Sequence, residues 1–448
     1  MNNFKDKKVL IFGLGLNQGG VGSANFFASQ GAKVKVTDFK SKEVLKESID
    51  QLKKYPNIEY SLDGHKNEDI DWADLIIKNP AVKPGNPYIE YALKKGKKME
   101  QDMGIFLDFV KSFQIIGITG TKGKSTTASM IYEILRNHPH GVTLAGNIGK
   151  SILDIITMMK AKKNKHLIVL ELSSFQLEAF DQHKVSPKYA VITNIYPDHL
   201  NYYSSLTEYK DAKRIIGKYQ TKDDFLFINR DKTTINNTNF LKGFKGQKNF
   251  YSSEDLPKNF NPLLKGNHNK SNMAAALAVG KILGMCEKTI LQTLSTFRGI
   301  PFRMELIKEW CGFKIYNDST ATNPDATIQA LKALGTKNED EEPNIILICG
   351  GMNKGINYTI WCTIVQRNVK KIFFLEGDST EEMKRLITKK DLVAGTFNDL
   401  EKLLTDVKSF VKEGDVILFS PAATSFNLFQ NEFDRGRKFN IAVQKVFK

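Results

Sequence analysis

With 448 residues, the chain is too long for a single hydrophobic core, so we expect two to four domains. Its 41% hydrophobic and 25% charged residues are ordinary for a globular protein, and the absence of a run of about 18 apolar residues excludes a membrane-spanning helix. The net charge of +16 comes from dispersed lysines without an arginine-rich tract, which predicts no specific nucleic-acid partner but could attract a phosphorylated small substrate.

The start of the chain and its cysteines favour the cytoplasm. The N-terminal residues lead directly into a strand pattern, without the regions of a signal peptide. The four cysteines are scattered and show no metal-type pairing, which is typical of reduced thiols. We therefore expect a cytoplasmic protein with no membrane insertion, and we expect it to be a monomer.

The first segment of the chain alternates strand and helix patterns. Strand patterns occur at residues 8–15, 33–39 and 72–82, and a helix pattern at residues 23–33 ends at Gly31. Alternation of this kind predicts a parallel sheet with helices on both faces.

The second and third segments repeat this alternation. After a helical stretch at 103–113, the apolar runs that predict strands are 114–120, 166–174, 189–195, 223–231, 313–319, 344–351, 370–377 and 415–421. We predict an α/β fold with three domains: an N-terminal Rossmann-like domain, a central P-loop ATPase-like parallel sheet and a C-terminal Rossmann-like domain. Their expected boundaries are 1–101, 102–300 and 301–448.

The stretch "GITGTKGKSTT" (residues 117–127) joins a strand to a helix and predicts a phosphate-binding loop. Gly120 and Gly123 would let backbone N–H groups close around phosphates, and the N-terminus of the following helix adds partial positive charge. Walker A spacing would require glycine at position 118, which is Ile118. The loop is therefore a variant of that motif.

Three polar side chains begin the helix after this loop. Lys124 can reach the β- and γ-phosphates of a nucleotide, and the hydroxyl of Ser125 or Thr126 can bind Mg²⁺. A run of Gly-Lys-Ser-Thr directly after a strand makes an ordinary glycine turn a poor alternative.

Two later strand ends carry candidate metal ligands. Within the stretch 166–174 the buried strand pattern ends in Glu171, where a carboxylate would face the ligand crevice of a parallel sheet. His199 follows the next strand, and Lys213 follows on a helix. Two cations beside a transferring phosphate would offset the charge of its transition state.

Polar residues also follow strands in the third segment. Asp318 could accept a ribose hydroxyl, and Lys354 could hold a carboxylate. Taken singly, each of these turns is equally well an ordinary loop.

The N-terminal turn "FGLGLNQGGVG" (residues 12–22) suggests a different class of protein. Gly13 and Gly15 fit a dinucleotide fingerprint, and Asp38 lies where a ribose-binding acid belongs, but Gln18 stands at the third glycine position. A nicotinamide-dependent oxidoreductase is therefore an alternative hypothesis.

Taken together, these motifs resemble the Mur ligase family. The matching stretches, which occur in family order from residue 9 to about 439, are "GITGTKGKSTT", "AGNIG", "ELSSFQLE", "TNIYPDHL", "GNHNKSN", "FRGIPFRME", "NDSTATNP", "GGMNKG" and "SPAATSFNLFQNEFDRG". The resemblance covers almost the whole chain, and the variant phosphate loop is itself typical of the family.

The resemblance implies an ATP-dependent ligase of peptidoglycan precursor synthesis. ATP would convert the carboxylate of UDP-N-acetylmuramoyl-L-alanine to an acyl phosphate, and the amine of D-glutamate would displace the phosphate. A sister ligase that adds a different amino acid is the near alternative. The cofactors implied are ATP and Mg²⁺, as two ions, with a carbamylated Lys213 as an extra anionic metal ligand.

The resemblance also implies the site residues by matching motif positions. Those implied for ATP are Gly120, Thr121, Lys122, Gly123, Lys124, Ser125, Thr126, Asn269, Asn272, Arg303 and Asp318. Those implied for the metal ions are Ser125, Thr126, Glu171, His199 and Lys213. The UDP-substrate would contact Leu16, Asn17, Asp38, Phe39, Lys40 and Asn147, and D-glutamate would contact Thr322, Lys354, Ser425 and Phe426. The catalytic set would be Lys124, Glu171, His199 and Lys213.

Overall fold

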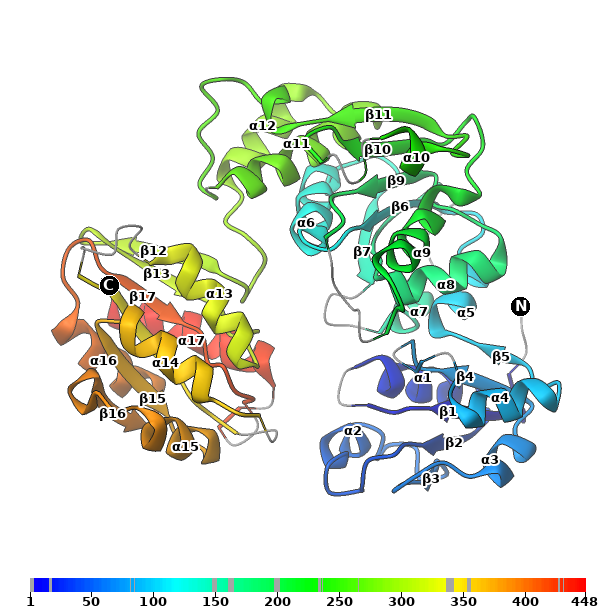
Figure 1. Ribbon diagram of the computed structural model, residues 1–448, viewed down its shortest axis with the longest axis horizontal. Coiled ribbons are helices and arrows are strands. Elements are labelled where there is room, and N and C mark those ends of the chain that lie inside the picture. The colour runs from blue at the N-terminus through cyan, green and yellow to red at the C-terminus, as the bar shows by residue number, and fades with distance from the viewer. Residues whose placement is uncertain are drawn as a thin grey trace. The chain divides into compact units, whose positions relative to one another are not determined.

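Two compact units make up the chain, Met1–Phe297 and Arg298–Lys448. The computed structural model describes residues 4–15, 18–80, 82–83, 85–146, 151–159, 165–196, 202–232, 235, 237–264, 266–335, 342–352, 356–425, 428–429 and 431–448. The first unit contains two sheets and the second contains one, each flanked by helices (Figure 1). The α/β class with three predominantly parallel sheets is confirmed, and the exact domain boundaries stay predictions.

The N-terminal sheet has the order β3-β2-β1-β4-β5, and its strand pairs are all parallel. Its strands are β1 Lys8–Phe12, β2 Lys33–Thr37, β3 Glu59–Ser61, β4 Leu75–Lys78 and β5 Met99–Glu100. Its helices are α1 Gln18–Ser29, α2 Lys46–Asp50, α3 Asn67–Trp72 and α4 Pro87–Lys94. Helix α1 begins five residues before the predicted helix, within the glycine-rich stretch, so the turn after β1 is shorter than its glycine content suggested.

The central sheet has the order β11-β10-β9-β6-β8-β7, again with parallel pairs. Its strands are β6 Gln114–Thr119, β7 Val142–Gly146, β8 Leu167–Glu171, β9 Tyr189–Ile192, β10 Phe225–Asn229 and β11 Gln247–Tyr251. The accompanying helices are α5 Asp102–Phe109, α6 Lys124–Leu135, α7 Asp154–Met159, α8 Ser174–His183, α9 Leu206–Lys218, α10 Thr238–Leu241, α11 Asn267–Ile282 and α12 Glu287–Thr296, with a 3₁₀ turn at Ser253–Asp255. The run of small and apolar residues in α11 lets it pack closely against α6.

One apolar cluster joins the two sheets of the first unit. It contains core residues of β1 and of β8, and the ring of Phe26 in α1 meets Phe109 in α5 edge to face at 6.1 Å. Beside it, Nε2 of His183 lies 2.8 Å from Oε2 of Glu100. Burial of this shared apolar surface explains why the two sheets form one compact unit.

Asp102, at the start of α5, gives this unit a testable pH dependence. Burial raises the pKa of Asp102 to about 6 from an ordinary value of 3.8, and the hydrogen bond it accepts from the Met103 amide opposes this only partly. Because the folded-state pKa is the higher one, the contribution of this group to stability is present at low pH and is lost as pH rises through about 6.

We expect Asp102→Asn to increase the free energy of unfolding by about 2–3 kcal/mol at pH 8, where wild-type Asp102 is ionised in both states. The gain should disappear near pH 4, where the folded carboxyl is protonated. Urea unfolding of both proteins at the two pH values measures this. An equal increase in the free energy of unfolding at both pH values would contradict the raised pKa of Asp102.

The C-terminal sheet has the order β12-β13-β17-β14-β15-β16. Its strands are β12 Glu305–Trp310, β13 Phe313–Asn317, β14 Ile345–Cys349, β15 Lys371–Leu375, β16 Val393–Phe397 and β17 Val416–Phe419. Its helices are α13 Pro324–Leu334, α14 Thr359–Asn368, α15 Asp378–Leu386, α16 Leu400–Phe410 and α17 Glu432–Val446, with a 3₁₀ turn at Lys390–Leu392. Strand β12, which the sequence analysis did not predict, is antiparallel to β13, whereas the other pairs are parallel.

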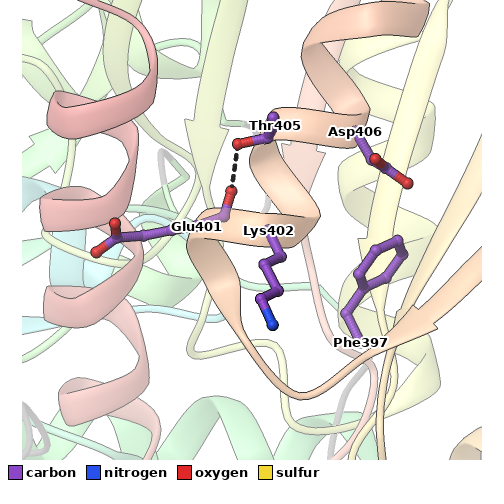
Figure 2. A pocket seen from close by; sticks show the side chains of 5 residues that line it. All are labelled: Phe397, Glu401, Lys402, Thr405 and Asp406. Carbon is purple, nitrogen blue, oxygen red and sulfur yellow. Dashed lines mark hydrogen bonds between the residues drawn. The ribbon is translucent and has the colours of Figure 1, made fainter.

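An open depression of about 470 Å³ lies between the end of β16 and the first turns of α16. Figure 2 shows its lining, which comes from Phe397, Glu401, Lys402, Thr405 and Asp406. The Thr405 hydroxyl donates to the backbone oxygen of Glu401 at 2.8 Å, so this contact belongs to the helix itself. The depression contains none of the residues that the sequence analysis singled out.

Among the described residues, none of the helices combines the length and the apolar character needed to cross a membrane.

Candidate functional site

The predicted phosphate loop lies between β6 and α6, at the carboxyl edge of the central sheet. Gly120 and Gly123 have φ values of +150° and +85°, which residues other than glycine rarely adopt. A Cβ atom at Gly120 would lie 2.0 Å from Oγ1 of Thr193, and one at Gly123 would lie 2.5 Å from Oδ1 of Asn272. The two glycines thus let the loop turn tightly against β9 and α11.

Two lysines from different helices converge on this loop. Nζ of Lys124, the first residue of α6, donates to the backbone oxygens of Gly120 and Thr121 at 3.0 Å each. Nζ of Lys213, in α9, donates to the same Gly120 oxygen at 3.0 Å and lies 4.7 Å from the ring of Tyr209. The fold therefore brings together two cationic side chains that are 89 residues apart in sequence.

Oxygen ligands suitable for Mg²⁺ lie on the elements next to the loop. Glu171 is the buried last residue of β8 and pairs in register with Ile118 of β6, two residues before Gly120. Ser125 and Thr126 are in the first turn of α6. Carboxylate and hydroxyl oxygens are hard donors that suit Mg²⁺, so this donor set fits the ion.

His199 lies outside the residues that the structure describes, between Tyr196 and Tyr202. Within the described residues, no group of three or more His, Cys, Asp or Glu side chains could hold a metal ion. Both metal sites therefore stay predictions.

Helix α11 places two asparagines near the phosphate loop. Asn272 faces Gly123, as the distance above shows, and Asn269 is in the preceding turn of the same helix. Both side chains are largely buried. The structure thus brings Asn272 to the predicted nucleotide site.

In the N-terminal sheet, Asp38 follows β2 and organises the turn after β1. Its Oδ2 accepts from the Gly15 amide at 2.9 Å, its Oδ1 accepts from the Lys40 amide at 3.0 Å, and Nζ of Lys40 lies 3.7 Å away. The Phe39 ring is 61% exposed and meets His65 edge to face at 4.3 Å. Leu16, Asn17 and Asn147 lie outside the described residues.

The second unit gathers polar residues at the ends of β13 and β17. Asp318 accepts from Oγ of Ser420 at 2.8 Å and from the Met304 amide at 3.1 Å. Burial raises the pKa of Asp318 to about 6, although these hydrogen bonds and nearby Arg303 favour its ionised form. The carboxyl is thus held in place by its neighbours, one residue past β13.

A two-residue bridge joins the loops after β14 and β17. Met352 and Thr424 exchange backbone hydrogen bonds of 3.1 Å in both directions. Ser425, next along the chain, is buried, and its hydroxyl has no hydrogen-bond partner within the described residues. Thr322 follows β13 in the same unit, whereas Lys354 and Phe426 lie outside the described residues.

The sequence analysis missed one buried cation in this region. Arg435, in α17, is fully buried and donates to Oγ and O of Ser319 and to O of Ala423 at 3.1, 2.7 and 3.0 Å. Burial lowers its pKa to about 9, against the opposing charges of Glu432 and Asp318. Its partners are 12 and 116 residues away, so no local pattern could have revealed them.

Comparison with known proteins identifies the family. Residues 7–100 match the Mur ligase MurD-like N-terminal domain, residues 118–280 the Mur ligase middle domain, and residues 302–423 the Mur ligase glutamate ligase domain. A protein of Roseiflexus sp. named UDP-N-acetylmuramoylalanine–D-glutamate ligase is 32% identical, with 98% of each chain covered. This chain belongs to the Mur ligase family.

Other Mur ligases agree with this assignment. A protein of Borreliella burgdorferi, also named UDP-N-acetylmuramoylalanine–D-glutamate ligase, is 34% identical over 100% of this chain and 99% of its own. The N-terminal Mur ligase match covers the glycine-rich turn that had suggested a nicotinamide site, which removes the support for an oxidoreductase.

Solved structures of Mur ligases share the fold. The UDP-N-acetylmuramate-alanine ligase MurC from Thermotoga maritima has a TM-score of 0.55 at 22% identity, with 98% of this chain and 99% of that chain covered. The murein peptide ligase Mpl from Psychrobacter arcticus has a TM-score of 0.51 at 17% identity, with 99% and 100% covered. As a Mur ligase, the chain uses ATP.

Proposed function

We propose that this Mur ligase joins D-glutamate to UDP-N-acetylmuramoyl-L-alanine, with hydrolysis of ATP to ADP and phosphate, in the synthesis of peptidoglycan precursors. The observation that carries the proposal is similarity along the entire chain to ligases named for this substrate and amino acid. The variant phosphate loop between β6 and α6 supports it. We further propose a monomer that acts in the cytoplasm, where its four free thiols would stay reduced.

The chemistry requires activation of a carboxylate. A carboxylate resists attack by an amine until one of its oxygens carries a phosphoryl group, which makes that oxygen part of a good leaving group. The substrate carboxylate would attack the γ-phosphorus of ATP, releasing ADP and forming an acyl phosphate. The D-glutamate amine would then attack the acyl carbon, and the tetrahedral intermediate would lose phosphate and a proton to give the amide.

Lys124 and the phosphate loop would bind ATP. The Lys124 ammonium now lies against two loop oxygens, so it is close enough to turn to the β- and γ-phosphates. Asn269 and Asn272 would contact the nucleotide from α11, and Arg303 and Asp318 would contribute from the second unit.

Magnesium would be held by Ser125 or Thr126 and by Glu171, with His199 and Lys213 at a second ion. Bound Mg²⁺ would offset the negative charge of the phosphates, so that the anionic carboxylate could approach the γ-phosphate. Lys213 would serve as an anionic ligand after carbamylation, which adds CO₂ to its neutral amine and releases a proton. Its buried position beside the Gly120 oxygen places it at the loop.

The other two substrates would bind in separate regions. Asp38, Phe39 and Lys40, with Leu16, Asn17 and Asn147, would hold the UDP-linked substrate. The exposed Phe39 ring offers a stacking surface for a base. Thr322, Lys354, Ser425 and Phe426 would hold D-glutamate, and the buried Ser425 hydroxyl is a donor suited to a carboxylate.

The direct test is to identify the product. The purified chain would be incubated with UDP-N-acetylmuramoyl-L-alanine, D-glutamate, ATP and Mg²⁺, and the nucleotide fraction analysed by mass spectrometry. We expect a product heavier than the substrate by one glutamyl residue, formed only when ATP is present. An unchanged nucleotide substrate alongside consumed ATP would contradict the proposal.

A further inference from the structure

Asn194, two residues after β9, pairs with the backbone of the phosphate loop. Its Oδ1 accepts from the Lys122 amide at 2.9 Å, and its Nδ2 donates to the Lys122 oxygen at 3.0 Å. Its own backbone oxygen accepts from the Thr121 amide at 2.9 Å. One asparagine therefore makes three hydrogen bonds to two consecutive residues of the loop.

These contacts continue the sheet beyond its last regular pair. Strands β6 and β9 pair in register as far as Thr119 and Ile192, and the Thr193 amide still donates to the Thr119 oxygen at 3.0 Å. Past that point the loop turns at Gly120. The planar carboxamide of Asn194 offers an acceptor and a donor side by side, so it replaces the peptide group that a neighbouring strand would supply.

Thr193 strengthens the same attachment. Its hydroxyl donates to the Lys122 oxygen at 2.7 Å, so that oxygen accepts two hydrogen bonds from side chains of the β9 end. Both the N–H and the C=O of Lys122 are thus engaged. This fixes the backbone of the residue that precedes the left-handed Gly123 and the start of α6.

We propose that Asn194 is a positioning residue for ATP, which holds the phosphate loop in its binding shape before the nucleotide arrives. The inference rests on the proposed function, because it assigns ATP phosphates to this loop. The proposal also distinguishes the loop amides that bind Asn194 from those that remain for the phosphates. The Thr121 and Lys122 amides are engaged by Asn194, so phosphate recognition belongs to the amides from Gly123 into α6.

A pre-shaped loop binds its ligand more tightly because ordering it costs no further entropy on binding. Removing the two carboxamide hydrogen bonds with Asn194→Ala should therefore weaken binding of a non-hydrolysable ATP analogue with Mg²⁺ by about 10- to 100-fold. Binding of UDP-N-acetylmuramoyl-L-alanine should stay unchanged. Calorimetric titration of each ligand in turn measures both affinities.

Asn229→Ala is the matched control. Asn229 ends the neighbouring strand β10, and its Nδ2 donates to the Thr193 oxygen at 3.2 Å and to the Ser271 hydroxyl at 2.7 Å. It thus makes comparable side-chain hydrogen bonds without contacting the loop backbone. We expect this variant to bind the ATP analogue within about threefold of the wild type, because neither of the lost hydrogen bonds is made to the phosphate loop. Equal weakening in both variants would mean that Asn194 is merely structural, and would overturn the inference.

Hydrogen exchange of the nucleotide-free wild type provides a test that does not depend on a variant folding. The Thr121 and Lys122 amides should be protected before any nucleotide is added. Rapid exchange that slows only with the ATP analogue would overturn the inference. A wild-type chain that fails to bind the analogue at all would instead refute the proposed function.

Discussion

Replacing Lys124 with alanine should reduce ATP-dependent acyl-phosphate formation by about 1,000-fold, to background. The ammonium is anchored by the Gly120 and Thr121 oxygens at the start of α6, where it adds a full charge to the partial charge of the helix N-terminus. Negative charge moves onto the leaving phosphate oxygens during transfer, and alanine would leave that charge without its principal protein cation.

The same variant should still bind the UDP-linked substrate. Most of the residues proposed for that substrate follow strands of the N-terminal sheet, around Asp38, whereas Lys124 begins α6 beside the central sheet. Hydroxylamine trapping of the acyl phosphate measures the first effect, and calorimetry measures the second. Lys218→Ala, which removes a half-exposed lysine paired with Asp181 at 2.6 Å, is the control and should keep normal activity. Near-normal trapping with Lys124→Ala would refute the assignment of the loop.

Replacing Arg435 with alanine should lower the free energy of unfolding of the second unit by about 3–5 kcal/mol. The guanidinium connects Ser319, two residues past β13, with Ala423, in the turn after β17. Without it, these buried acceptors lose their donors and Asp318 loses a nearby positive charge. Because Asp318, Thr322 and Ser425 flank these two turns, we also expect the KM for D-glutamate to rise.

Tryptophan fluorescence can follow this loss of stability. Trp310 and Trp361 both lie in the second unit, so urea unfolding in a Trp72→Phe background would report on that unit alone. Arg437→Ala is the matched control, since its side chain lies on the same helix, is 57% exposed and pairs with Asp434 at 3.8 Å. It should change stability by less than about 0.5–1 kcal/mol. Equal unfolding curves for the two variants would show that the buried contacts of Arg435 contribute little.

The strands that the sequence predicted and those that it missed differ in position. All eleven predicted strands lie inside their sheets, and most of them are nearly continuous apolar runs, although β2 and β13 alternate apolar and polar residues. The six missed strands, β3, β5, β7, β11, β12 and β16, are the two edges of each sheet. β11 has mostly exposed side chains, β16 has only half-buried ones, and β5 has two residues, so none of the three shows such a run.

The functional residues likewise differ in how far their roles could be predicted from the sequence. Gly120, Gly123 and Lys124 form a local motif, so their sequence alone predicted a loop that the structure places between a strand and a helix. The contacts of Asn194 and Arg435 join residues 72 and 116 positions apart. Such partners depend on how the sheets assemble, so the motifs that contain these two residues, "TNIYPDHL" and "SPAATSFNLFQNEFDRG", do not reveal them.

The proposed reaction couples ATP hydrolysis to the addition of D-glutamate. It can be tested by measuring phosphate release from ATP with UDP-N-acetylmuramoyl-L-alanine present and a panel of D- and L-amino acids added one at a time. We expect phosphate release with D-glutamate alone. Release with a different amino acid would keep the mechanism but replace the substrate, and no release with any of them would refute the proposed ligase activity.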